Sequence, residues 1–185
     1  MKTSDVKWDP STHVVSDFLD WSNSGRLELQ PDFQRKVVWS KSAKIMLIDT
    51  ILRNIPMPKV FLQTEIRGRD PYRIVIDGQQ RLTAILGFIR GEFGLESPYE
   101  GEFLGMKFQD IPQEAQTKVL RYRIDVNEIY DATPEMIRDI YSRVNKYTVQ
   151  LNKQELRKAD YPGDYLKPRR NWLMPPSSKK TAFSQ

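Results

Sequence analysis

The chain has 185 residues, of which 39% are hydrophobic and 29% charged, which suits one folded domain with a single core. It contains no cysteine, which excludes disulfides, thiol catalysis, zinc–thiolate sites and iron–sulfur clusters. Of the 29 basic residues, five lie in residues 165–185 together with no acid, which leaves 24 basic residues against 24 acidic ones elsewhere. The net charge of +5 therefore comes from the C-terminal end.

The start of the chain is polar, and its longest apolar runs, such as Ile45-Met46-Leu47-Ile48, have only four residues. We therefore expect no signal peptide, no membrane partner and a cytoplasmic location.

Hydrophobic periodicity and turn signals predict an alternation of helices and strands. In the first half of the chain the predicted elements are a helix over 14–23, a strand over 27–29, and a helix that is capped by Ser40 or Ser42 and ends before Pro56. Strands over 60–63 and 73–76, joined by a charged turn over 65–71, come next, followed by a helix from 79 to about 90 and a loop over 91–105. The remaining predicted elements are a helix from 111 to about 120, a strand over 122–126, and helices over 134–144 and 153–159. Thr133 is the predicted N-cap of the helix over 134–144, with Pro134 at its first position. The order predicts an α+β domain with a small mixed sheet over residues 1–161, followed by a basic tail over 162–185 that contains Pro, Ser and Lys.

The most informative stretch is Val75 to Thr83, which reads Val-Ile-Asp-Gly-Gln-Gln-Arg-Leu-Thr. It predicts a strand, a tight turn at Asp77-Gly78 and then a helix. Gly78 permits positive φ or a close approach to a ligand, and the free N–H groups of a helix N-terminus suit a phosphate. Gln79 and Gln80 add amide donors and acceptors, and Arg81 adds a planar guanidinium.

A simpler interpretation of this stretch stays open. Asp-Gly is a common turn dipeptide, and Arg81 could be a solvated residue of the first helical turn. On residue types alone the two interpretations are balanced.

Other candidates are weaker. Gln34 and Arg35 form a second Gln-Arg pair in an irregular turn, although Arg35 could simply pair with an acid. Arg143 and Asn145 close the helix over 134–144, where a cation and an Asn cap are ordinary. The single histidine, His13, would have to serve any Ser-His-Asp triad, and we interpret it as a surface or capping-region residue.

Taken together, several motifs resemble a known family. Phe33-Gln34-Arg35 with Trp39, the Asp77–Arg81 stretch (DGQQR), Arg143-Val144-Asn145, and Leu151 to Arg157 are similar to the ParB-like domain at the N-terminus of GmrSD-type, modification-dependent (type IV) restriction enzymes and related phage-defence proteins. The similarity covers roughly residues 12 to 160, and DGQQR with FQR upstream is a specific combination.

The resemblance implies a ParB/sulfiredoxin-like fold and a nucleoside triphosphate (GTP, ATP or CTP) held with Mg²⁺ at the DGQQR turn. It implies catalytic roles for Asp77, Gln80 and Arg81, with Asp77 as the metal ligand. Further residues would complete the binding site. These are Gln34, Arg35, Gly78, Gln79, Arg143 and Asn145.

Such proteins usually carry a second, histidine-containing nuclease domain, which this sequence lacks. We expect a stand-alone sensor, a subunit that works with a nuclease on another chain or by self-association, or a fragment. The leading hypothesis is a nucleotide-binding regulatory domain, with slow NTPase activity as an open question. The alternatives are a non-catalytic DNA-binding module that uses the basic tail and, last, a nuclease.

Overall fold

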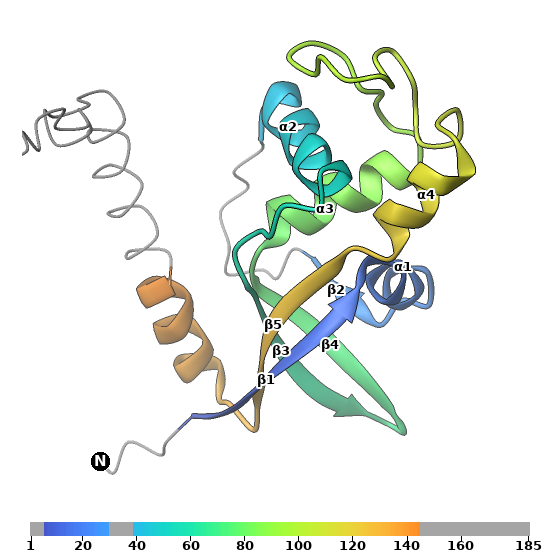
Figure 1. Ribbon diagram of the computed structural model, residues 1–185. Coiled ribbons are helices and arrows are strands. Elements are labelled where there is room, and N and C mark those ends of the chain that lie inside the picture. Colours follow the sequence, from blue (N-terminus) through green and yellow to red (C-terminus); the bar gives the residue numbers. More distant parts are fainter. Residues whose placement is uncertain (1–5, 30–38, 145–185) are drawn as a thin grey trace, which may run out of the picture. The chain divides into compact units, whose positions relative to one another are not determined.

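The computed structural model describes residues 6–29 and 39–144 (Figure 1). The predicted helix over 153–159, the boundary at residue 161 and the basic tail lie outside the described residues, as do Gln34, Arg35 and Asn145. The elements in chain order are β1 (Lys7–Val14), α1 (Val15–Asn23), β2 (Leu27–Glu28), α2 (Lys41–Leu52), β3 (Val60–Arg67), β4 (Asp70–Asp77), α3 (Gln79–Ile89), α4 (Gln113–Leu120) and β5 (Arg123–Tyr130). A further helix follows over residues 134–144. The predicted α+β class is confirmed.

The strands form one mixed sheet in the order β1-β5-β3-β4-β2. β3 and β4 form an antiparallel hairpin, and β1 pairs antiparallel with β5. The β3–β5 and β2–β4 pairs are parallel. The β3–β4 register shifts between Phe61 and Leu62, so the hairpin is irregular next to the end of β4.

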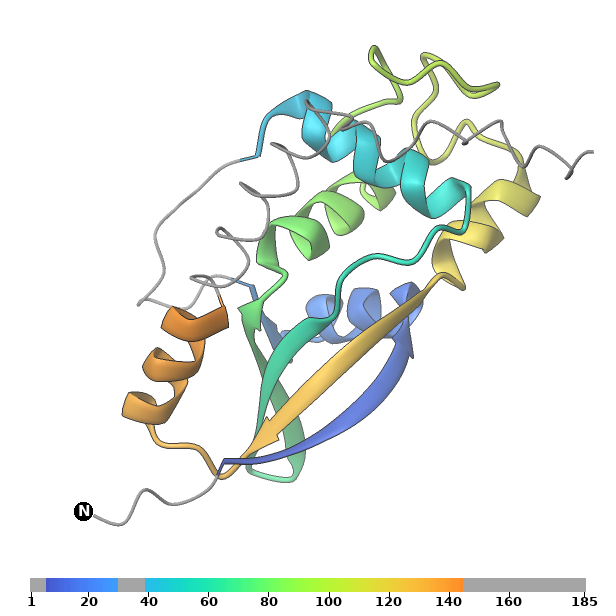
Figure 2. The ribbon, with the colours of Figure 1, turned by 60° about the vertical axis from the view of Figure 1, so that its left-hand side comes forward.

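Side chains of the strands alternate between the two faces of the sheet, and each face carries a hydrophobic cluster, the second one much smaller than the first. Val60, Leu62 and Val75 belong to the main core, which the helices α1 to α4 complete. Phe61 and Ile76 point to the opposite face and pack with Ile137 of the helix over 134–144. The two views show this helix apart from α2, α3 and α4 (Figures 1 and 2).

Capping residues identify two helix starts correctly. Ser40 accepts a hydrogen bond from the Ala43 N–H at 3.2 Å, and Thr133 accepts one from the Met136 N–H at 3.4 Å. Neither bond involves the apolar pattern, so each is an independent signal for a helix start.

The strands differ more from their predictions. β1 was not predicted, because its Lys-Trp-Asp-Pro-Ser-Thr-His-Val sequence is polar and contains a proline. Such residues suit an edge strand, which is where β1 lies. β3 and β4 extend into the predicted charged turn and leave only Gly68 and Arg69 between them. Within the described ranges, the structure has no helix long and apolar enough to cross a membrane.

Candidate functional site

The predicted turn lies at the junction of β4 and α3, which Gly78 forms alone. Its φ of +97° lies in the left-handed region, and it is the N-cap residue of α3. A Cβ at this position would lie 2.8 Å from Cγ2 of Val60, a fully buried side chain of β3. Both the backbone conformation and the close packing of β3 therefore require glycine here. The sequence predicted a positive φ or a close approach at Gly78, and the structure shows the positive φ.

The first turn of α3 presents backbone donors. The first intrahelical hydrogen bond is from the Leu82 N–H to the Gly78 carbonyl at 2.9 Å, and no side chain of the described ranges caps the helix. The N–H groups before Leu82 and the positive end of the helix dipole suit an anion.

Arg81 is held by the protein itself. Its Nη2 donates to the Asp77 carboxylate at 2.9 Å and to the Lys59 carbonyl at 3.1 Å, and its Nη1 donates to the Pro58 carbonyl. Burial lowers the pKa of Arg81, and the Asp77 carboxylate opposes that shift. These bonds use three of the five guanidinium N–H donors. Arg81 therefore links the segment before β3 to the β4–α3 junction.

The two glutamines also have partners. Gln79 donates through Nε2 to the Val75 carbonyl at 3.0 Å, which ties the first residue of α3 back onto β4. Gln80 accepts the Trp39 N–H on Oε1 at 3.1 Å, which joins the start of α3 to the segment entering α2. Among the described residues, no group accepts a hydrogen bond from the amide nitrogen of Gln80.

Residues 15–162 match the family described as the N-terminal domain of the GmrSD restriction endonuclease. The chain belongs to this family. The match covers most of the sequence and associates this GmrSD N-terminal domain with restriction-type phage defence. No curated protein and no solved structure matches the chain.

In this GmrSD N-terminal domain, Arg143 makes a local bond. Its Nε donates to the Asp139 carboxylate at 2.8 Å, one helical turn earlier, and its side chain is exposed. Ile140 and Tyr141, which precede it, pack against the cluster that contains Ile76. The same helix therefore reaches the end of β4, but a role for Arg143 in the site stays a prediction.

Asp77 is the one predicted metal ligand. Its Oδ2 is bonded to Arg81, and the described residues include no group of three His, Cys, Asp or Glu side chains that could hold a metal ion. Mg²⁺ commonly binds through one or two carboxylates together with phosphate oxygens and water. Asp77 is compatible with that pattern only when a phosphate supplies further ligands.

The sequence did not indicate a polar cluster on the sheet next to α1. His13 lies in β1 and is largely buried rather than on the surface, with its Nε2 2.8 Å from Oε1 of Glu128. Ser11 donates its hydroxyl to the same carboxylate oxygen at 2.9 Å. The Ser11 hydroxyl also lies 3.2 Å from Nε2 of His13, so Ser11, His13 and Glu128 form one hydrogen-bonded cluster.

Proposed function

We propose that this domain binds a nucleoside triphosphate with Mg²⁺ at the β4–α3 junction and acts as the regulatory module of a restriction-type system. The observation that supports the proposal is the start of α3, where a left-handed glycine replaces a capping side chain and leaves first-turn N–H groups for an anion. The amide nitrogen of Gln80 lies on the same turn and adds a side-chain donor. GTP, ATP and CTP share the phosphate chemistry that this junction would recognise.

The arrangement supports binding more directly than hydrolysis. Charge stabilisation during phosphoryl transfer needs a cation that faces the reacting phosphate. Three N–H donors of Arg81 are already bonded to the Asp77 carboxylate and to the carbonyls of residues 58 and 59, so they do not face a phosphate. We therefore propose binding as the primary function, and Asp77, Gln80 and Arg81 as the residues of any slow hydrolytic step.

A charge substitution at the first residue of α3 tests the anion site. Gln79→Glu places a carboxylate beside the free N–H groups, where it would occupy or repel the phosphate position. Gln113→Glu is the matched control, because Gln113 is the first residue of α4 and is exposed. Calorimetric titration with each triphosphate and Mg²⁺ should show at least about tenfold weaker binding for Gln79→Glu and unchanged binding for Gln113→Glu.

Equal affinity of wild type and Gln79→Glu for every triphosphate would refute the site. Thermal unfolding of each variant checks that the loss of the Gln79–Val75 bond has not unfolded the domain. Arg81→Ala is a poor probe by itself, because it would leave the Asp77 carboxylate and the two carbonyls without their donor.

A further inference from the structure

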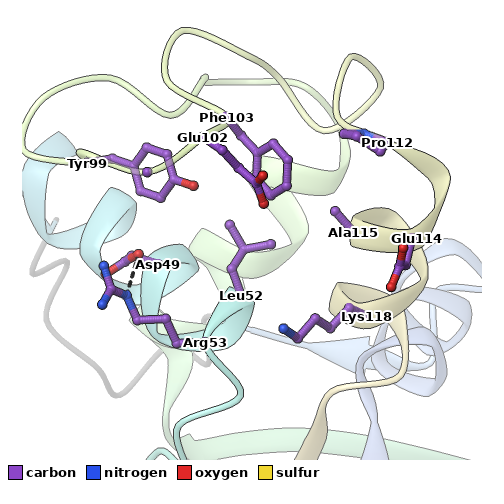
Figure 3. A pocket seen from close by; sticks show the side chains of 11 residues that line it. Asp49, Leu52, Arg53, Tyr99, Glu102, Phe103, Pro112, Glu114, Ala115 and Lys118 are labelled. Atoms are coloured by element: carbon purple, nitrogen blue, oxygen red, sulfur yellow. Dashed lines mark hydrogen bonds and ion pairs between the residues drawn. The ribbon is translucent and has the colours of Figure 1, made fainter.

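A pocket of about 500 Å³ lies between α2, the loop over residues 91–111 and α4 (Figure 3). On α2 it is lined by Asp49 and Leu52, with Arg53 directly after the helix. The opposite end of α2 is the one joined to the β4–α3 junction, through the bond from Trp39 to Gln80. A helix of this length extends about 18 Å, so the pocket is separate from the proposed nucleotide site.

The loop wall of the pocket is fixed by the protein. The Leu95 N–H donates to the Met106 carbonyl and the Gly105 N–H to the Leu95 carbonyl, both at 2.8 Å. The Lys41 ammonium bonds Glu96 at 2.7 Å and ties the loop to the start of α2. These contacts make the cavity a preformed one, as small-molecule sites usually are.

Tyr99 and Gly101 of the loop both line this pocket. The side chain is buried, and its phenol folds so closely over Gly101 that no Cβ fits there. Its hydroxyl points into the pocket (Figure 3). Leu52, Phe103 and Ala115 supply apolar surface around it.

The charged side chains of the pocket differ in whether the protein already neutralises them. Asp49 and Arg53 form an ion pair at 2.9 Å, and the Asp49 hydrogen bond raises the pKa of Arg53. Glu102, Glu114 and Lys118 have no ion-pair partner among the residues the structure describes. Glu102 and Lys118 come from opposite walls, the loop and α4 respectively (Figure 3).

We propose that this pocket binds a small zwitterion with an apolar body, of the amino-acid type. The ligand's ammonium group would bond the Glu102 carboxylate and the Tyr99 hydroxyl, and its carboxylate would bond the Lys118 ammonium. The apolar body would lie on Leu52 and Phe103. This inference concerns a second site and does not rest on nucleotide binding.

Three probes with a common phenyl ring separate the two charged groups. L-phenylalanine carries both charges, phenethylamine only the ammonium and 3-phenylpropionate only the carboxylate. Titrations of the full chain at low salt, monitored by NMR, should show that L-phenylalanine binds roughly tenfold more tightly than either analogue. A ligand with one charge leaves the opposite group of the pocket unpaired.

Two charge-removing variants test which pocket residue binds the ammonium group of the ligand and which binds its carboxylate. Glu102→Gln should weaken L-phenylalanine and phenethylamine but not 3-phenylpropionate, and Lys118→Gln should weaken L-phenylalanine and 3-phenylpropionate but not phenethylamine. Glu100→Gln is the matched control, because Glu100 is an exposed acid of the same loop that does not line the pocket. The proposal is overturned if no probe saturates, if an analogue binds as tightly as L-phenylalanine, or if the two variants do not differ in this way.

Discussion

At the scale of single residues, Glu128 is a buried carboxylate that four side chains hold. His13 and Ser11 from β1 contact one carboxylate oxygen, and Thr64 and Tyr130 donate to the other. The hydrogen bond from His13, which outweighs the opposing effect of burial, lowers the pKa of Glu128 to about 2. Because these partners come from β1, β3 and β5, the ionised carboxylate links three strands.

This depressed pKa predicts a specific acid sensitivity. A group whose pKa is lower in the folded than in the unfolded chain stabilises the fold above its ordinary pKa of about 4.5, and that stability is lost as the pH falls towards 2. We expect Glu128→Gln to remove up to roughly 3 kcal/mol of pH-dependent stability across this range. Urea unfolding at several pH values between 2.5 and 6 measures it. The exposed Glu100→Gln serves as control, and equal pH slopes for both variants and wild type would contradict the assignment.

Arg81 shows what residue types leave undetermined. Its place in a ligand-binding motif indicated a guanidinium directed at phosphate, whereas the structure directs much of it at the carbonyls of residues 58 and 59. Those carbonyls are more than twenty residues away in the sequence. No local pattern indicates such a contact, so the motif predicts the turn and the helix start better than the contacts of each side chain.

At the scale of elements, the junction of β4 and α3 was predictable because its signals are local. The apolar strand, the Asp-Gly turn and the helical spacing after it occupy one short stretch of sequence. The caps at Ser40 and Thr133 are local in the same sense. β1 was not predictable in this way, because an edge strand with few buried side chains leaves no period-two pattern.

The packing of this junction yields a second prediction. Gly78→Ala would force a side chain into the left-handed region and place its Cβ 2.8 Å from Val60. We expect a loss of about 2–4 kcal/mol in the free energy of unfolding, from backbone strain and overpacking together. Chemical denaturation of Gly78→Ala, Val60→Ala and the double variant separates the two causes. Val60→Ala should cost less in the Gly78→Ala background, and strict additivity would show that the contact with Val60 contributes nothing.

At the scale of the whole molecule, the hydrophobic clusters on the two faces of the sheet both reach the strand that leads into the proposed site. Val75 packs into the main core, whereas Ile76 packs into the second cluster with Ile137. Asp77 and Gly78 follow directly, so the turn is held between elements on both sides of the sheet. A site of this kind is built on a rigid strand and helix, and that limits how far its donors can move on binding.

The distribution of charge over the chain separates the nucleotide proposal from its DNA-binding alternative. Outside residues 165–185 the basic and acidic residues balance at 24 each. We therefore predict that any affinity for duplex DNA resides in Lys167, Arg169, Arg170, Lys179 and Lys180. Five cations limit the slope of log K against log salt to about −4.5.

Fluorescence anisotropy with a labelled duplex over a range of salt concentrations measures that slope. Replacing the five cations by glutamine removes the charge and keeps the chain length, whereas deleting residues 165–185 removes both. Both variants should lose DNA binding. They should keep the nucleotide affinity of the full chain, because the β4–α3 junction lies outside residues 165–185 and is unchanged in both. DNA binding that survives both changes would place the DNA contact on the folded domain, and the anion site of α3 would then be the first place to test for a DNA phosphate.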